Sequence, residues 1–158
     1  MSCFLGLLHE GTIMSQFSLR PYDRDSDFPY VIRSWTQCCH GTFPWRIAPE
    51  RVWGVEWRAR CVAVLERSSC MIACDPEDHS VIFGFIIYEP DVLHFVYTKH
   101  AFRGFGIAHA LVNAAAPELG KRETTITWVP PRPKEHPECD IIGQHNLVYN
   151  PFKGPIGQ

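Results

Sequence analysis

The 158-residue chain has no apolar run that approaches the ~20 residues needed to span a membrane, so no membrane partner is expected. Neither sign of charge dominates, because 15 Lys and Arg face 17 Asp and Glu and leave a formal net charge of −2. A nucleic-acid-binding domain usually carries a basic excess, which this chain does not have. The length and the 46% hydrophobic content instead indicate one globular domain with its own core.

Two well-known phosphate-binding motifs are also missing. The chain contains no Gly-Lys-Ser/Thr, which excludes an ATP-type P-loop. A dinucleotide fingerprint needs a third glycine three residues after the second, and His109 occupies that position. Any phosphate ligand must therefore be recognised in another way.

The seven cysteines do not indicate a disulfide framework, because their number is odd and their spacing is irregular. We predict small buried thiols in a reducing cytoplasm. A metal pattern could be drawn through Cys70, Cys74 and His79, but it lacks a second ligand pair and two of its members fall in or beside a predicted strand. No metal is expected.

The segment 103–108, Arg-Gly-Phe-Gly-Ile-Ala, is the most informative part of the chain. It follows a strand-like run over residues 92–98 and opens an Ala-rich helical run over residues 107–116. The first amides of a helix have no partner inside the helix, and the helix dipole adds positive potential there. Gly104 and Gly106 keep side chains out of the way, so the pattern predicts an anion site at a strand-to-helix turn.

The remaining chain alternates strand and helix patterns. Strands are expected at residues 17–20, 70–73, 81–88, 92–98, 124–128 and 147–149, and helices at about 25–40, 49–63 and 107–116. In the second helix, a Val/Ala stripe is the expected buried face, and Trp53 with Trp57 forms a second stripe. The Val/Ala stripe consists of Val52, Val55, Ala59, Val62 and Ala63. Residues 1–14 are predicted to be an N-terminal arm or an upstream start, and residues 15–158 a single domain.

The glycine turn closely resembles the acetyl-CoA pyrophosphate loop of the GCN5-related N-acetyltransferases, whose pattern is Arg/Gln-x-x-Gly-x-Gly/Ala. Arg103, Gly106 and Ala108 stand in the three fixed places. The element order agrees over residues 15–128, whereas the specific motif is confined to 93–116. The resemblance implies an α/β acyl-CoA N-acyltransferase fold, with a mostly antiparallel central sheet flanked by helices, and acetyl-CoA as co-substrate. A simple packing turn is the alternative interpretation of these glycines.

The resemblance also implies where acetyl-CoA binds. The pyrophosphate would meet the turn, and the pantetheine arm would pair with the end of the preceding strand, where the fourth and fifth strands of the family diverge. The implied turn residues are Arg103, Gly104, Phe105, Gly106, Ile107 and Ala108, and the implied strand residues are Val96, Tyr97 and Thr98.

The expected chemistry is direct transfer of acetyl to a primary amine on a small molecule or a protein. An aliphatic amine has a pKa near ~10.4, so a base is needed at neutral pH, and Glu89 and His94 are the candidates. The family often uses a tyrosine to protonate the CoA thiolate, for which Tyr149 is the first candidate and Tyr97 the second. Cys74 and Cys139 have no visible base beside them, which argues against an acyl-cysteine.

The tail departs from the family, since prolines replace the usual helix with its Asn and Tyr. A non-catalytic binding protein of the same fold, or a structural component of an assembly, is therefore the alternative function. For such contacts, or for a homodimer, the helix with Trp53 and Trp57 and the apolar arm offer surfaces. The small size and the Tyr149-Asn150-Pro151-Phe152 ending also resemble small acetyltransferase-like proteins of tailed phages.

Overall fold

The computed structural model of the chain describes residues 16–40, 47–117, 119, 124–128 and 147–150. A six-stranded sheet lies at its centre, with the strands in sequence order. Neighbouring strands run antiparallel from the first to the fourth and parallel from the fourth to the sixth. The strands are β1 (Ser18–Pro21), β2 (Ser69–Cys74), β3 (Ile82–Glu89), β4 (Val92–Thr98), β5 (Thr124–Ile126) and β6 (Leu147–Tyr149).

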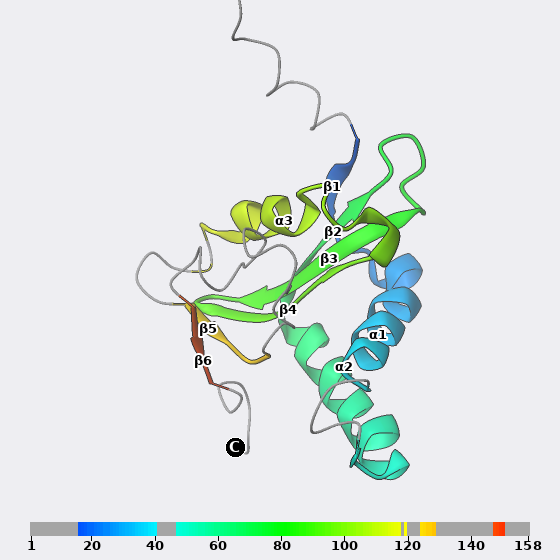
Figure 1. Cartoon of the computed structure of the whole chain (residues 1–158), viewed down its shortest axis with the longest axis vertical. Helices are drawn as coiled ribbons and strands as arrows, with labels where there is room; N and C mark the ends of the chain where they lie inside the picture. Colours follow the sequence, from blue (N-terminus) through cyan, green and yellow to red (C-terminus); the bar gives the residue numbers. More distant parts are fainter. Residues whose placement is uncertain (1–15, 41–46, 118, 120–123, 129–146, 151–158) are drawn as a thin grey trace, which may run out of the picture.

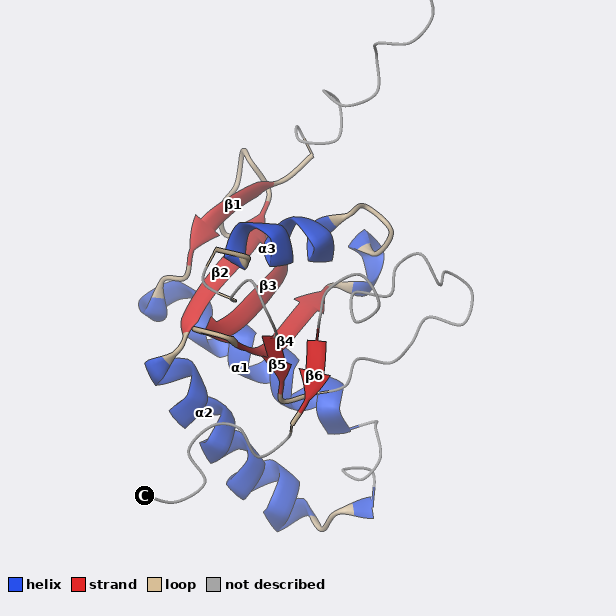
Figure 2. Ribbon diagram, turned by 90° about the vertical axis from the view of Figure 1, so that its left-hand side faces the viewer, coloured by secondary structure: helices blue, strands red, loops and turns tan. Residues whose placement is uncertain are grey.

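Helices cover both faces of this sheet. One face carries α1 and α2, and α3 lies on the other, as the views in Figure 1 and Figure 2 both show. The helices are α1 (Arg24–His40), the π-helical segment η2 (Arg51–Trp57) that continues into α2 (Arg58–Arg67), the short η3 (His100–Phe102) and α3 (Ile107–Ala115). The predicted mixed α/β class is confirmed. The proposed arm, residues 1–14, lies outside the described residues.

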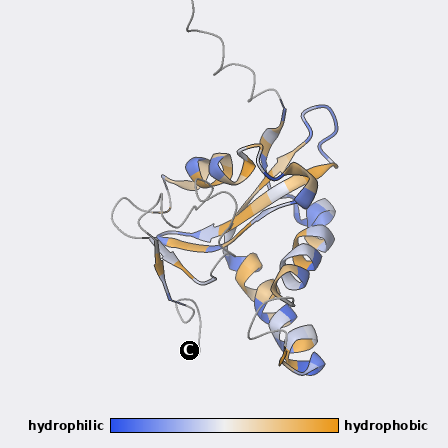
Figure 3. Cartoon of the chain, viewed as in Figure 1, coloured by the Kyte–Doolittle hydropathy of each residue, from blue (hydrophilic) through white to orange (hydrophobic). Residues whose placement is uncertain are grey.

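The central strand β3 is buried along almost its whole length. All residues from Ile82 to Tyr88 are buried, as expected for a strand that is covered on both faces. Figure 3 shows the hydrophobic strand beside the hydrophilic β2–β3 loop. Phe85 packs against Phe95 and Tyr97 on the α1 face, whereas Ile86 and Leu93 pack under α3. β3 and β4 therefore join two core clusters into one domain.

A buried ion pair fixes the start of α1. Arg20 of β1 donates two hydrogen bonds to the carboxylate of Asp27, at 2.6 and 2.8 Å, and Asp27 is only 2% exposed. The same carboxylate accepts the backbone amide of Asp23, while Asp23 accepts the amide of Asp25. Together these bonds satisfy amides at the helix N-terminus that have no helical partner.

Although Val62 packs against the core, the predicted buried face of the second helix is largely wrong. Val55 is 63% exposed and Ala59 and Ala63 lie on the exposed side, whereas Cys61, Val64 and Leu65 are buried. The stripe that faces the core consists of Trp57, Cys61, Val64 and Leu65, at the spacing i, i+4, i+7, i+8. The sequence contains two apolar stripes that could face the core. The stripe with the larger indole side chains does so, because Trp57 packs edge-on against Trp35, with 6.4 Å between the ring centroids.

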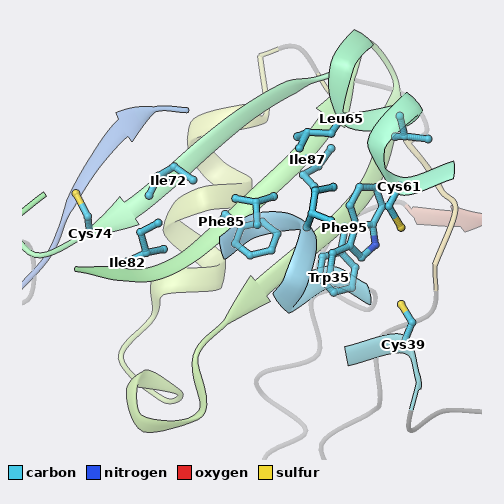
Figure 4. Packing of buried hydrophobic residues seen from close by; sticks show 13 residues of the cluster. Trp35, Cys39, Cys61, Leu65, Ile72, Cys74, Ile82, Phe85, Ile87 and Phe95 are labelled. Atoms are coloured by element: carbon cyan, nitrogen blue, oxygen red, sulfur yellow. The ribbon is translucent and has the colours of Figure 1, made fainter. Parts of the chain in front are cut away.

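Several cysteines belong to the core of this layer. Figure 4 shows Cys39 and Cys61 beside Trp35 and Phe95, whereas Cys74 lies away from them at the end of β2, next to β1. Burial raises the pKa of the Cys39 thiol to about 12, so at neutral pH this side chain is a small apolar group. Within the described residues, no helix is long and apolar enough to cross a membrane.

Candidate active site

The sheet opens beside β4. β5 pairs with β4 only at Val92 and Leu93, and the chain bends at Thr127, after which the ring of Trp128 still packs against Phe95 of β4. On its other side β4 pairs with β3, with a register shift that leaves His94 without a partner on β3. Such a bulge bends a strand and reorients its backbone. The edge of β4 beyond Leu93 is therefore not covered by β5.

The alternation of backbone hydrogen bonds along β4, on the side of the bulge that leads to Lys99, determines which main-chain groups face that open edge. The amide of Lys99 donates to the carbonyl of Phe83 at 2.8 Å, so every second residue back along β4 directs its polar groups toward β3. The groups of Val96 and Thr98 consequently point to the side that β5 leaves uncovered. Of the three predicted pantetheine contacts, Val96 and Thr98 thus present main-chain groups at the open edge, whereas Tyr97 presents its own to β3.

The glycine turn lies at the end of β4. Gly104 and Gly106 have φ angles of +85° and +76°, a conformation that L side chains rarely adopt. Apart from the chain neighbours, no heavy atom of the described residues lies within 4 Å of the place where a Cβ would stand at either glycine. The turn thus has the predicted backbone and open space above it.

The start of α3 is placed over the sheet by a third glycine. The first bond inside α3 is donated by Ala110 to the carbonyl of Gly106 at 3.0 Å, so the amides of Ile107, Ala108 and His109 have no partner within the helix. A Cβ at Gly84 would lie 2.4 Å from the carbonyl oxygen of Tyr97 and 3.2 Å from Ile107. The missing side chain at position 84 therefore lets the helix N-terminus approach the sheet.

Two further groups border the turn. The guanidinium Nε of Arg103 reaches back to the carbonyl of Thr98 at 3.4 Å, so its charge lies beside the end of β4. The hydroxyl of Thr98 is buried and has no hydrogen-bond partner among the described residues. A buried polar group without a partner is unfavourable unless a ligand or water satisfies it, so this position suits a polar ligand along the open edge.

Glu89 and His94, the two candidate bases, are in direct contact at the other end of β4. Glu89 ends β3 and His94 is the bulge residue, and their Oε1 and Nε2 atoms lie 2.8 Å apart. The same oxygen accepts Arg67 Nε at 2.7 Å and the hydroxyl of Ser68 at 3.3 Å. On the other side of the ring, His94 Nδ1 lies 3.1 Å from the hydroxyl oxygen of Thr127.

The surroundings set the protonation states of this pair. Burial lowers the pKa of His94 below its ordinary value of 6.5, and the hydrogen bond to Glu89 opposes this shift without reversing it. Burial alone would raise the pKa of Glu89, but the hydrogen bonds from His94 and Arg67 outweigh it and hold the pKa below 4.5. At neutral pH the site contains a neutral imidazole beside an ionised carboxylate.

Tyr149, the first candidate acid, is not part of this network. It lies in β6, is 53% exposed and pairs in register with Ile126, whose side chain packs in the α3 layer. Thr127 follows Ile126 and contacts His94 instead. Tyr97 packs on the α1 face against Phe85. The proposed acid role of Tyr149 stays a prediction.

The comparisons with known proteins bear on the fold. Neither a family model nor a curated protein gives a significant match. Among solved structures, a protein from Rhodopseudomonas palustris described as a GCN5-related N-acetyltransferase matches with a TM-score of 0.50 at 20% identity, over 67% of each chain. A protein from Pyrococcus furiosus, provisionally described as an acetyl transferase, gives a TM-score of 0.54 at 13% identity, over 75% of this chain and 86% of that one.

The chain has the fold of the GCN5-related N-acetyltransferases. The N-acetyltransferase fold confirms the architecture implied by the glycine turn and the element order. It does not choose a substrate, because one fold can support many functions. Within the residues that the structure describes, no group of three His, Cys, Asp or Glu side chains could hold a metal ion.

Three residues of this candidate site were not predicted from the sequence. Arg67 and Thr127 carry no local motif, and they reach Glu89 and His94 only through the tertiary fold. Gly84 did carry a signal, since a glycine inside an apolar strand often marks a close approach of another segment. Here that segment is the start of α3.

Proposed function

We propose that this protein is an acetyl-CoA-dependent N-acetyltransferase that transfers acetyl to a primary amine by direct attack. One observation carries the proposal. β4 has the glycine turn and the N-terminus of α3 at its C-terminal end, the Glu89–His94 pair at the bulge near its start, and an edge between them that β5 leaves uncovered. The fold alone would not require these three features to share one strand.

The residues present fit acetyl-CoA. The open space over Gly104 and Gly106 and the free amides at the start of α3 suit a pyrophosphate, and the charge of Arg103 lies close by. The main chain of Val96 and Thr98 would hold an extended arm in the manner of an added strand. When bound, acetyl-CoA supplies an activated acetyl thioester.

The amine needs a proton acceptor. With a pKa near ~10.4, an aliphatic amine is mostly protonated at neutral pH and cannot attack until it loses a proton. We assign the role of base to the neutral His94, because the carboxylate of Glu89 beside its imidazole would stabilise the charge that it gains. The main-chain amide of Val96 would donate to the thioester oxygen at the open edge.

Acetyl-CoA turnover with a panel of amines tests this proposal. The panel would hold a lysine peptide, a peptide with a free N-terminus, a polyamine, an aminoglycoside and an amino-nucleotide, and release of the free CoA thiol would be recorded. Turnover with at least one amine, and its loss in His94→Gln, is the expected result. CoA binding without turnover on any amine would instead support a non-catalytic binding protein.

Calorimetry separates the failure of binding from the failure of chemistry. The parent should bind CoA, and His94→Gln should bind it as tightly, because His94 lies at the opposite end of β4 from the glycine turn. No heat of binding at roughly millimolar CoA, a concentration that would detect even weak sites, would remove the cofactor assignment.

A further inference from the structure

His94 is enclosed on all sides. It is 3% exposed, and both of its ring nitrogens already have partners, Glu89 at Nε2 and Thr127 at Nδ1. An amine in the opening beside β4 therefore cannot reach the imidazole without displacing one of them. If His94 is the base of the proposed reaction, the proton must pass through a neighbour.

The partners define which ring nitrogen can accept that proton. The carboxylate of Glu89 only accepts hydrogen bonds, so Nε2 carries the hydrogen and donates it. In a neutral ring the lone pair then lies on Nδ1, which faces the Thr127 hydroxyl at 3.1 Å. The other acceptor near that hydroxyl, the carbonyl of His94, is farther away at 3.4 Å.

Thr127 stands where the sheet opens. Its amide donates to the carbonyl of Leu93 at 3.2 Å, which is the last bond joining the β5 segment to β4 before the two diverge. Its side chain is half-buried, in contrast to the enclosed His94. The hydroxyl thus contacts the buried ring at the residue where the pairing of β4 with β5 ends.

Building on the proposed function, we propose that Thr127 is the residue that meets the acceptor and passes its proton to His94. Before it attacks, the protonated amine gives one proton to Thr127 Oγ1, and the hydroxyl proton of Thr127 moves to Nδ1 of His94. As the neutral amine nitrogen then bonds to the acetyl carbon, the electron pair of the breaking C–S bond leaves with sulfur, and the second proton of the nitrogen goes to the CoA thiolate. The resulting imidazolium faces the carboxylate of Glu89, and Thr127 ends the cycle as a hydroxyl.

Glu89 is the rival for this role. Its hydrogen bonds with Arg67, Ser68 and His94 all use Oε1, and 28% of its side chain is exposed, so its second oxygen could itself meet an amine. Burial raises the pKa of Glu89, but the hydrogen bonds from His94 and Arg67 outweigh this and hold the pKa below its ordinary value, which makes the carboxylate a weaker proton acceptor. If Glu89 were the base, removing the Thr127 hydroxyl would leave kcat unchanged, whereas the proposed role of Thr127 predicts that kcat falls.

Steady-state kinetics on four variants separates these roles, using an amine that the parent acetylates. Thr127→Val removes the hydroxyl at nearly constant shape and should lower kcat by about 10²-fold, the usual scale for one proton-transfer group, with KM for acetyl-CoA unchanged. Thr127→Ser should restore most of kcat. Thr36→Val is the matched control, because Thr36 is a buried threonine of α1 whose hydroxyl only bonds to carbonyls of its own helix, chiefly that of Ile32.

The fourth variant, Glu89→Gln, keeps an acceptor for Nε2–H and removes the charge. A kcat unchanged in Thr127→Val, together with a kcat lost in Glu89→Gln, would overturn the proposal in favour of Glu89 as the base. An acetyl group found on Thr127 by mass spectrometry would overturn it as well, since the threonine would then be a nucleophile. If the parent acetylates no amine, the proposed function fails first.

NMR of the His94 ring gives a readout that needs no activity. In the parent, the ring nitrogens should show hydrogen on Nε2, and the ring should stay neutral down to a pKa below 6.5. The charged groups that act on the ring are Glu89 of β3 and Arg67 and Arg60 of α2. Thr127→Val leaves Nδ1 without its partner and should shift the Nδ1 resonance, and an unchanged Nδ1 resonance would overturn the Thr127 role.

Discussion

Replacing Gly106 by valine tests whether the glycine turn is a ligand site or a packing turn. Gly106 has a φ of +76°, and an L side chain in that region costs roughly 1–2 kcal/mol or more. Within the part of the chain that the structure describes, only the chain neighbours of Gly106 have heavy atoms within 4 Å of the position that a Cβ would take, so the new side chain meets open space there. The effect on folding should therefore stay near this backbone cost, a fall in melting temperature of roughly 2–8 °C for a chain of this size.

The effect on the ligand should be larger. The methyl groups of valine would stand in the space through which a phosphate approaches the amides of Ile107 and Ala108. Each lost charge-assisted contact costs roughly 1.5–3 kcal/mol, so losing one or two predicts a Kd for CoA raised at least ~10-fold. Calorimetry with CoA measures this value, and thermal denaturation measures the folding cost on the same sample.

Gly54→Val is the matched control. Gly54 lies in η2, where a Cβ would make only an ordinary 3.7 Å contact with Glu50, so this variant should keep both the parent's stability and its affinity. If Gly106→Val binds CoA as tightly as Gly54→Val, the turn serves packing alone, and the acetyl-CoA assignment loses its main support.

Three other variants test separate parts of the structure. Gly84→Ala would place a Cβ 2.4 Å from the Tyr97 carbonyl, so it should lower the free energy of unfolding by about 1–3 kcal/mol; an unchanged urea midpoint would refute that close approach. Tyr149→Phe should lower kcat by about 10²-fold while CoA affinity is retained, and unchanged turnover would remove Tyr149 from the mechanism. Burial raises the pKa of Asp27, but the hydrogen bonds from Arg20 outweigh this, and the net pKa lies below 3.8. The stability that this carboxylate contributes is therefore complete above about pH 4 and is lost as the pH falls through the lower folded pKa. Asp27→Asn should accordingly flatten the plot of melting temperature against pH in that acid range.

The parts of the fold that were predictable from sequence rest on local patterns. β4 and β6 form over the predicted residues, and the glycine turn has the expected backbone, because strand alternation and a glycine-marked helix start are written into neighbouring residues. The buried face of the second helix was not predictable in this way. Its valines and its tryptophans form two apolar stripes, and only the packing of Trp57 against Trp35 determines which of them faces the core.

The candidate site shows the same limit. Glu89 and His94 were each identified as possible bases, yet their contact depends on a bulge in β4, and a single-residue register shift leaves no mark in the alternation of the strand. Thr127 reads as an ordinary strand residue. It reaches His94 only because β5 runs parallel to β4, a pairing between segments about thirty residues apart.

The close contact between Gly84 and the start of α3 also couples β3 to the N-terminus of α3, two segments that are distant in the sequence. Ile107 rests on the bare backbone of β3, so the helix N-terminus cannot move without disturbing the innermost ladder of the sheet. Any anion held by the first turn of α3 would consequently slow hydrogen exchange at buried amides of β3, beneath the helix that holds the ligand. Binding of an anion at the surface turn could thus be detected as slower hydrogen exchange at the buried amides of β3.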